Sequence, residues 1–147
     1  MKKRITLVTS IVVLTLVCAM LFAACAPAAD PDAAKKNLKD EGYSATVYDG
    51  DGMVVGTALA LAGVENVNKV LVASKYSNDT FEFLTVFYFD SAKDANNAVD
   101  KAKEYAKDRE KEEEKDQKKE EGSVEWVFGK SGKMIWFGTK AAVKAAR

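Results

Sequence analysis

The sequence predicts one α+β domain in which about six antiparallel strands form three hairpins, with helices packed on one face of the sheet. Segments with the alternating pattern of strands come in pairs, and turns rich in Gly, Asp or Asn join the members of each pair. Helical segments separate the pairs instead of alternating with single strands, which argues against a doubly wound parallel sheet. The chain has 147 residues, 48% of them hydrophobic, and this suffices for a single core.

The composition excludes several classes of function. There is no histidine, so the chain has neither Ser-His-Asp nor Cys-His catalytic machinery, nor a His-ligated zinc site. Its 22 basic and 22 acidic residues give no net charge and hence no indication of nucleic-acid binding. Two cysteines are too few for a disulfide-rich scaffold or a four-cysteine metal site. We therefore expect no enzyme, no cofactor, no metal site and no nucleic-acid partner.

The first 24 residues have the pattern of an export signal. Residues 2–4 are basic, and residues 5–24 carry no charge. An apolar run of about 20 residues is long enough to span a bilayer, so a permanent N-terminal helix is one interpretation. The run ends in two alanines directly before Cys25, and small residues at this place suit cleavage by a signal peptidase.

This order of charge, apolar run, two alanines and cysteine resembles the lipobox of bacterial lipoproteins. The resemblance covers residues 1–25 and departs from the family pattern at Phe22, where leucine is most frequent. It implies that residues 1–24 are removed, that the Cys25 thiol receives a diacylglyceryl group and that the new amino terminus is acylated. Cys18 lacks small residues before it and is not the predicted site. Lipid would hold the exported chain on the outer side of the bacterial cell membrane, and ordinary secretion is the other alternative.

Removal of the signal changes the exported chain in two ways. It leaves 19 of the 22 basic residues against 22 acidic ones, a net charge of −3. It also leaves no cysteine for a disulfide, because Cys18 is lost and Cys25 carries lipid. Residues 25–30 form a short linker, which keeps the domain of residues 31–147 within about 20 Å of the lipid.

The domain begins with a helix over residues 31–40. Asp30 suits the N-cap position and Pro31 the first helical position, and Gly42 ends the helix. Alternation of apolar and polar residues over positions 43–48 then predicts a strand.

A turn of sequence Asp-Gly-Asp-Gly follows at residues 49–52. Alternate carboxylates also open an EF-hand calcium loop, but Met53 stands at the third ligand position and no glutamate closes the loop. We therefore expect a tight hairpin turn, a strand at residues 53–55 and a short apolar helix at residues 58–62.

The same order of elements recurs at the C-terminus. A strand over residues 124–128, a Gly-rich turn, a strand over residues 134–137 and a helix over residues 139–147 match the unit at residues 43–62. This similarity predicts an internal αββα duplication, and the alternative is two similar hairpins by chance. The Gly-Lys-Ser of the turn does not complete a phosphate-binding loop, because Val124 occupies the place of the required glycine.

The most apolar part of the domain lies between these two units. It predicts a strand over residues 70–73 and a longer one over residues 80–89. The longer strand carries phenylalanines on one face and Leu84, Val86 and Tyr88 on the other. A strand that is apolar on both faces is expected at the centre of a sheet, covered by helices, a second copy of the chain or a ligand.

A long helix follows from Ser91, its predicted N-cap, and Asp94 completes a capping box. Small residues recur at helical spacing as far as Tyr105 and predict a stripe that packs on the sheet. Residues 107–122 carry both charges and no strongly apolar side chain. We expect a solvated helical spur there, and a partner-binding extension is the alternative.

Four aromatic residues form the candidate binding surface: Trp126, Trp136, Tyr48 and Tyr88. Aromatic rings on an open sheet face or in an edge groove can stack on sugars or anchor a protein partner. The alternative is that the tryptophans belong to the core, and the strand face that Trp126 shares with two other apolar residues favours this for Trp126.

The sequence therefore predicts a membrane-anchored extracytoplasmic lipoprotein that acts as a binding or accessory module for an unknown protein or small molecule. The alternative is an inhibitor or sensor of an extracellular enzyme, because tandem helix-and-hairpin units resemble, in outline, the β-lactamase inhibitory proteins. A homodimer is compatible with either function.

Overall fold

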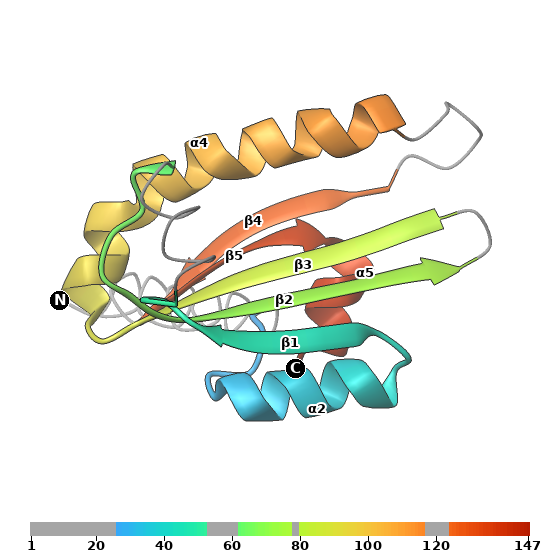
Figure 1. Ribbon diagram of the computed structural model, residues 1–147, viewed down its shortest axis with the longest axis horizontal. Coiled ribbons are helices and arrows are strands. Elements are labelled where there is room, and N and C mark those ends of the chain that lie inside the picture. Colours follow the sequence, from blue (N-terminus) through green and yellow to red (C-terminus); the bar gives the residue numbers. More distant parts are fainter. Residues whose placement is uncertain (1–25, 53–61, 78–79, 117–123) are drawn as a thin grey trace, which may run out of the picture.

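The computed structural model describes residues 26–52, 62–77, 80–116 and 124–147 of the chain. Within these residues, five antiparallel strands form one sheet in the order β1-β2-β3-β5-β4, and three helices accompany it (Figure 1). The α+β fold class is thereby confirmed. In chain order the elements are α2 (Pro31–Asp40), β1 (Ser44–Asp49), β2 (Val67–Ser77), β3 (Thr80–Phe89), α4 (Ala92–Asp116), β4 (Trp126–Ser131), β5 (Met134–Thr139) and α5 (Lys140–Ala145).

β3 lies at the centre of the sheet. It pairs with β2 in the register Tyr76↔Phe81 and with β5 in the register Val86↔Trp136. β1 extends the sheet beyond β2, and β4 extends it beyond β5. From Leu84 onward, the even-numbered residues of β3 pack into one core and its phenylalanines into another. The predicted central strand with two apolar faces is therefore confirmed.

Helices cover both faces of the sheet. α2 and α5 pack on the face that carries Leu84, which we call the α2/α5 face, and α4 packs on the face that carries Phe87, the α4 face (Figure 1). The prediction that the helices pack on one face is therefore wrong. Because β3 carries apolar side chains on both faces, each face has to be covered. α4 supplies the second cover through small residues that let it lie close to the sheet: Ala95, Ala98, Ala102 and Ala106.

α2 and α4 begin at the capping residues that the sequence predicts. The Asp30 carboxylate accepts a hydrogen bond from the Ala33 amide at 3.0 Å, and α2 has the predicted bounds. The Ser91 hydroxyl oxygen accepts one from the Asp94 amide at 3.0 Å ahead of α4, and Thr139 caps α5. None of the helices in the described parts of the chain is long and apolar enough to cross a membrane.

Several elements differ from the prediction or lie outside the described residues. β2 is longer than residues 70–73, and it pairs with the whole of β1. α4 continues to Asp116, so the charged spur is helical that far, and its remainder lies outside the described residues. The predicted strand at residues 53–55 and nearly all of the helix at residues 58–62 also lie outside them. The internal duplication therefore stays a prediction.

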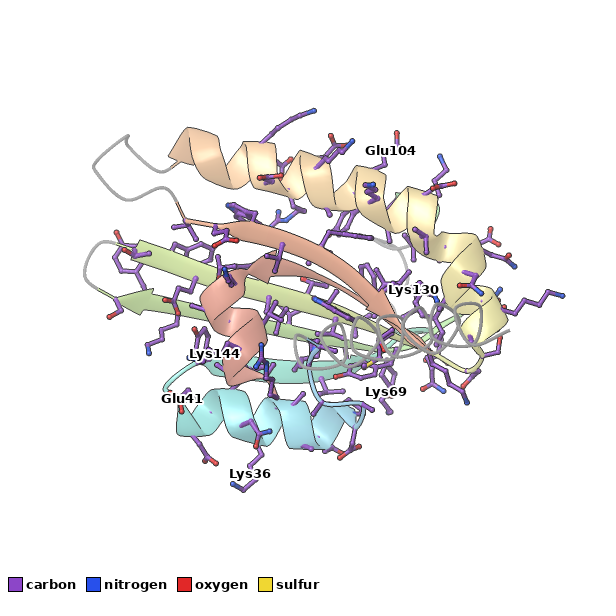
Figure 2. The ribbon with its side chains drawn as sticks, turned by 180° about the vertical axis from the view of Figure 1, so that it is seen from behind. Lys36, Glu41, Lys69, Glu104, Lys130 and Lys144 are labelled. Carbon is purple, nitrogen blue, oxygen red and sulfur yellow. The ribbon has the colours of Figure 1, made fainter. Side chains whose placement is uncertain are left out.

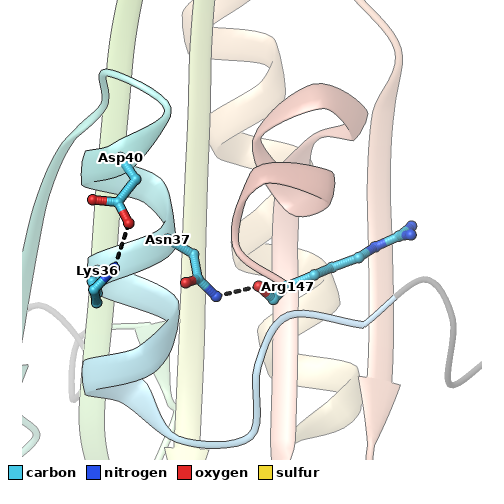
Figure 3. A network of polar contacts seen from close by, with 4 residues as sticks. All are labelled: Lys36, Asn37, Asp40 and Arg147. Atoms are coloured by element: carbon cyan, nitrogen blue, oxygen red, sulfur yellow. Dashed lines mark hydrogen bonds and ion pairs between the residues drawn. The ribbon is translucent and has the colours of Figure 1, made fainter.

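α2 is tied to the last residue of the chain. The Asn37 side-chain amide donates a hydrogen bond to the backbone carbonyl of Arg147 (Figure 3). Beside it, Lys36 and Asp40 form an exposed ion pair one helical turn apart at 2.5 Å, a kind of contact that contributes only about 0.2–0.5 kcal/mol. The contact of Asn37 joins positions 110 residues apart and fixes α2 next to α5.

Candidate functional site

Two of the four predicted aromatic residues lie in the core of the α2/α5 face. Trp136 is 5% exposed, and its indole lies so close to Gly129 that a Cβ at position 129 would come within 2.3 Å of the ring. Tyr88 is buried, and its hydroxyl donates a hydrogen bond to the Ala28 carbonyl at 3.2 Å. Both rings are used by the fold and do not form a surface for a ligand.

The other two predicted residues lie on the α4 face, at opposite edges of the sheet. Trp126 on β4 is half-buried, and its ring centre is 6.4 Å from that of Phe83. Tyr48 on β1 is 43% exposed and lies opposite Val70. The four predicted residues therefore do not form one surface.

A different set of aromatic residues gathers on the α4 face, and we call it the aromatic patch: Tyr76, Phe81, Phe83 and Trp126. Tyr76 is 72% exposed and lies opposite Phe81 in the β2–β3 hairpin. Phe81 stacks on Phe83 with ring centres 6.3 Å apart, and Phe83 in turn contacts Trp126. The patch thus extends from an exposed tyrosine to a buried phenylalanine.

Sequence reasoning missed Tyr76 because the strand was predicted to end at Ala73, whereas β2 continues to Ser77. One feature of the sequence could have identified Tyr76. Tyr76 has the same parity along the strand as Val70 and Val72, which belong to the core under α4. Since alternate residues of a strand share a face, this parity places Tyr76 on the α4 face.

Charged residues of α4 border the aromatic patch. The Arg109 guanidinium lies 5.7 Å from the centre of the Phe83 ring, within cation–π range, and also pairs with Glu112 at 3.1 Å. Beside it, a groove of about 130 Å³ lies between α4 and β4. This is below the 300–1,000 Å³ of typical small-molecule pockets, so the groove has room for about one side chain. Its lining includes Lys103, Lys107, Glu110, Trp126 and Phe128.

A larger hollow of about 480 Å³ lies where β3 begins and β5 passes into α5. The carboxylates in its lining already have partners. Glu125 pairs with Lys140 at 3.0 Å, and Glu82 accepts a hydrogen bond from the Tyr43 hydroxyl. Because the lining contains no aromatic ring and its carboxylates are engaged, this hollow is a weaker candidate than the aromatic patch.

The two tyrosines buried on the α2/α5 face are structural hydrogen-bond donors. Burial raises the pKa of Tyr43, and the hydrogen bond to Glu82 raises it further. Burial also raises the pKa of Tyr88, with a smaller effect from the negative charge of Asp30. Both hydroxyls therefore stay protonated at neutral pH. In the described parts of the chain, no group of three or more Cys, Asp or Glu side chains could hold a metal ion.

Cys25, the predicted lipidation site, lies outside the described residues, but the chain directly after it packs against the α2/α5 face. The Ala28 amide donates a hydrogen bond to the Ala146 carbonyl at 2.8 Å. The Ala28 carbonyl accepts the hydrogen bond of Tyr88. The segment expected to be a linker is therefore part of the fold from residue 26 onward.

Comparison of the chain with protein-family models, with curated proteins and with solved structures gives no match. A function is therefore inferred from the residues and their geometry alone.

Proposed function

We propose that this chain is an exported bacterial lipoprotein, anchored through Cys25 to the outer side of the cell membrane, and that its domain binds a protein partner through the aromatic patch. The domain acts as an accessory module and not as an enzyme. The anchor is supported by the pattern of residues 1–25, and the binding activity by the geometry of the α4 face.

The observation that carries the proposal is Tyr76, which is 72% exposed and pairs in the sheet with Phe81, the first of a row of aromatic rings. Tyrosine, tryptophan and arginine are the residues most enriched at the energetic centres of protein interfaces. Phe83 joins the patch to the core, and Arg109 lies over the same ring. A tyrosine side chain has few rotatable bonds, so it loses little conformational entropy when a partner covers it.

A protein fits this surface better than a small molecule does. The adjoining groove of about 130 Å³ is too small to enclose a ligand of ordinary size, but it can accept one side chain of a partner. Lys103, Lys107 and Glu110 border the groove, which gives the aromatic centre the charged rim that is typical of protein interfaces.

The proposal is tested by a photo-reactive amino acid placed at position 76 of the full chain in bacteria that process lipoproteins. The matched control carries the same amino acid at position 48, because Tyr48 is an exposed tyrosine on the same face of the sheet but on the edge strand β1. We expect a covalent adduct with one protein from position 76 and none from position 48. We also expect Tyr76→Ala to lose this partner in co-purification. No adduct at either position, or equal adducts at both, contradicts the proposal.

The identity of the cross-linked protein also decides between two roles. An extracellular enzyme whose rate changes on binding makes the chain an inhibitor or a sensor. A partner without such a change makes it an accessory module that holds that partner near the membrane.

A further inference from the structure

We infer that the segment after Cys25 fixes the domain in one orientation on the bilayer, with the α2/α5 face against the lipid headgroups and the aromatic patch directed away from them. The α2/α5 face thus contacts lipid, whereas the aromatic patch on the other side of the sheet contacts the proposed protein partner. The inference rests on the lipidation of Cys25 that is proposed above.

The first observation is that residues 26–30 do not act as a flexible tether. Pro27 is buried, and both backbone polar groups of Ala28 are hydrogen-bonded within the domain, to Ala146 and to Tyr88. Asp30 then caps α2. The chain is therefore held by the domain from Ala26 onward.

The second observation is the distance between Cys25 and Ala26, which covalent geometry fixes. Consecutive Cα atoms are about 3.8 Å apart, so the acylated residue lies directly beside Ala26. Ala26 and Ala28 pack against the core of the α2/α5 face, on the opposite side of the sheet from α4. With the acyl chains in the bilayer, this face lies at the headgroups, and α4 lies beyond the sheet as the far layer (Figure 1).

The charge of the α2/α5 face agrees with this orientation. Residues 30–41 and 140–147, which form α2, α5 and their caps, carry six basic and four acidic side chains. The rest of the exported chain carries 13 basic and 18 acidic side chains. Bacterial membranes that contain anionic lipid attract the basic face and repel the acidic remainder.

The inference is tested with single fluorophores on the full lipoprotein, purified with its lipid. Because Cys18 is removed with the signal and Cys25 is acylated, an introduced cysteine is the single free thiol. Lys36→Cys places it on α2 and Glu104→Cys on α4. The two native side chains are 74% and 68% exposed and point away from opposite sides of the molecule (Figure 2).

Each labelled protein is inserted into vesicles of phosphatidylethanolamine and phosphatidylglycerol that contain a lipid with a nitroxide on its headgroup. This nitroxide quenches fluorescence only at short range. We expect loss of fluorescence at position 36 and none at position 104, because the sheet and two helical layers, each about 10 Å thick, separate the two sites. Equal quenching at both sites, or quenching at position 104 alone, overturns the inference.

Absence of lipidation, which would contradict the proposed function, gives a different result from absence of orientation. If the chain is not lipidated, mass spectrometry finds no acyl mass, and the wild type and the Cys25→Ser variant behave alike with vesicles. Both bind if the N-terminal apolar segment is retained as a helix, and neither binds if it is removed. If the chain is lipidated but not oriented, it associates with vesicles and the labels at positions 36 and 104 are quenched equally.

A second variant tests whether the docked segment is the cause of the orientation. A flexible Gly-Ser segment of about eight residues, inserted between Cys25 and Ala26, reaches roughly 16 Å and leaves residues 26–30 intact. We expect the difference in quenching between positions 36 and 104 to disappear while vesicle binding persists. An unchanged difference would show that another contact orients the domain and would refute the role of the docked segment.

Discussion

The α2/α5 face of the sheet is closed by segments from both ends of the described chain, whereas the described residues that cover the α4 face are α4 and the segment around Val64. On the α2/α5 face, residues 26–30, α2 and α5 meet one another, and the buried hydroxyls of Tyr43 and Tyr88 both have partners. On the α4 face, α4 packs on β3, β5 and β4, and Tyr76 on β2 stays exposed. One face thus completes the fold, and the other keeps an accessible surface.

The two faces also differ in the size of their side chains. Small residues such as Ala34, Ala142 and Ala146 let α2 and α5 lie close to the sheet and to the N-terminal segment. The α4 face instead holds aromatic rings whose centres are 5.7–6.4 Å apart, from Tyr105 through Phe137 and on to the patch. Tyr76 pairs in the sheet with Phe81 at the end of this row and is 72% exposed, so a partner that covers it removes a large amphipathic ring from water.

The largest expected effect concerns Cys25, the residue proposed to carry the lipid anchor. Cys25→Ser removes the thiol that would carry lipid, so we expect complete loss of acylation and either release of the chain or accumulation of the unprocessed form. Membrane fractionation with mass spectrometry measures both. Cys18→Ser is the matched control and should change neither. Unchanged membrane retention of Cys25→Ser without a change in mass would indicate a permanent N-terminal helix.

The next largest effect is a loss of stability when a buried side chain is removed from either of the two cores. Phe137→Ala removes a buried ring of the α4 face and should lower the free energy of unfolding by about 3–5 kcal/mol, and Leu38→Ala on the α2/α5 face by about 2–5 kcal/mol. Because both cores share β3, we expect each variant to unfold in one transition, measured by urea titration. Two separate transitions in either variant would show that the faces are independent units.

A smaller effect depends on pH and is confined to the α2/α5 face. The folded-state pKa values of Tyr43 and Tyr88 are raised, chiefly by burial, so unfolded phenols ionise at about pH 10 while the folded ones do not. The contribution of these two phenols to the free energy of unfolding should therefore be constant below about pH 10 and fall above it. Tyr88→Phe should reduce this alkaline loss, measured by urea titration at about pH 8 and about pH 11. Tyr48→Phe, an exposed tyrosine, is the control, and an equal reduction there contradicts the explanation.

The smallest effect on stability is expected at the site proposed for binding. Because Tyr76 is 72% exposed, Tyr76→Ala should change the free energy of unfolding by no more than about 0.5 kcal/mol. Thermal unfolding measures this change. A loss of several kcal/mol would mean that Tyr76 serves the fold, and its exposure would then not indicate a partner.

Local chemistry made parts of the fold predictable. The Asp30-Pro31 start and Gly42 gave the bounds of α2, and the alternation of two apolar faces gave the bounds and the central place of β3. Strand pairing was not predictable in the same way. β1 pairs with β2, which lies beyond the intervening residues 50–66, and periodicity within a segment does not specify its partner.

The candidate site was less predictable than the fold. Trp136 and Trp126 both alternate in β-strands, but what covers each of them depends on which helix packs on which face. The sequence therefore could not tell a core ring from a surface ring. Tyr76 was missed because polar Ser74 and Lys75 interrupt the apolar run, although the strand itself continues.

The hydrogen bond between Ala28 and Ala146 has a consequence for the order of folding. If the chain is exported as proposed, residue 28 reaches the outer surface of the membrane before residue 146 does. The segment of residues 26–30 then cannot dock against Ala146 until the chain has crossed as far as residue 146. Docking of this segment, and with it the proposed orientation, would therefore be a late step of folding.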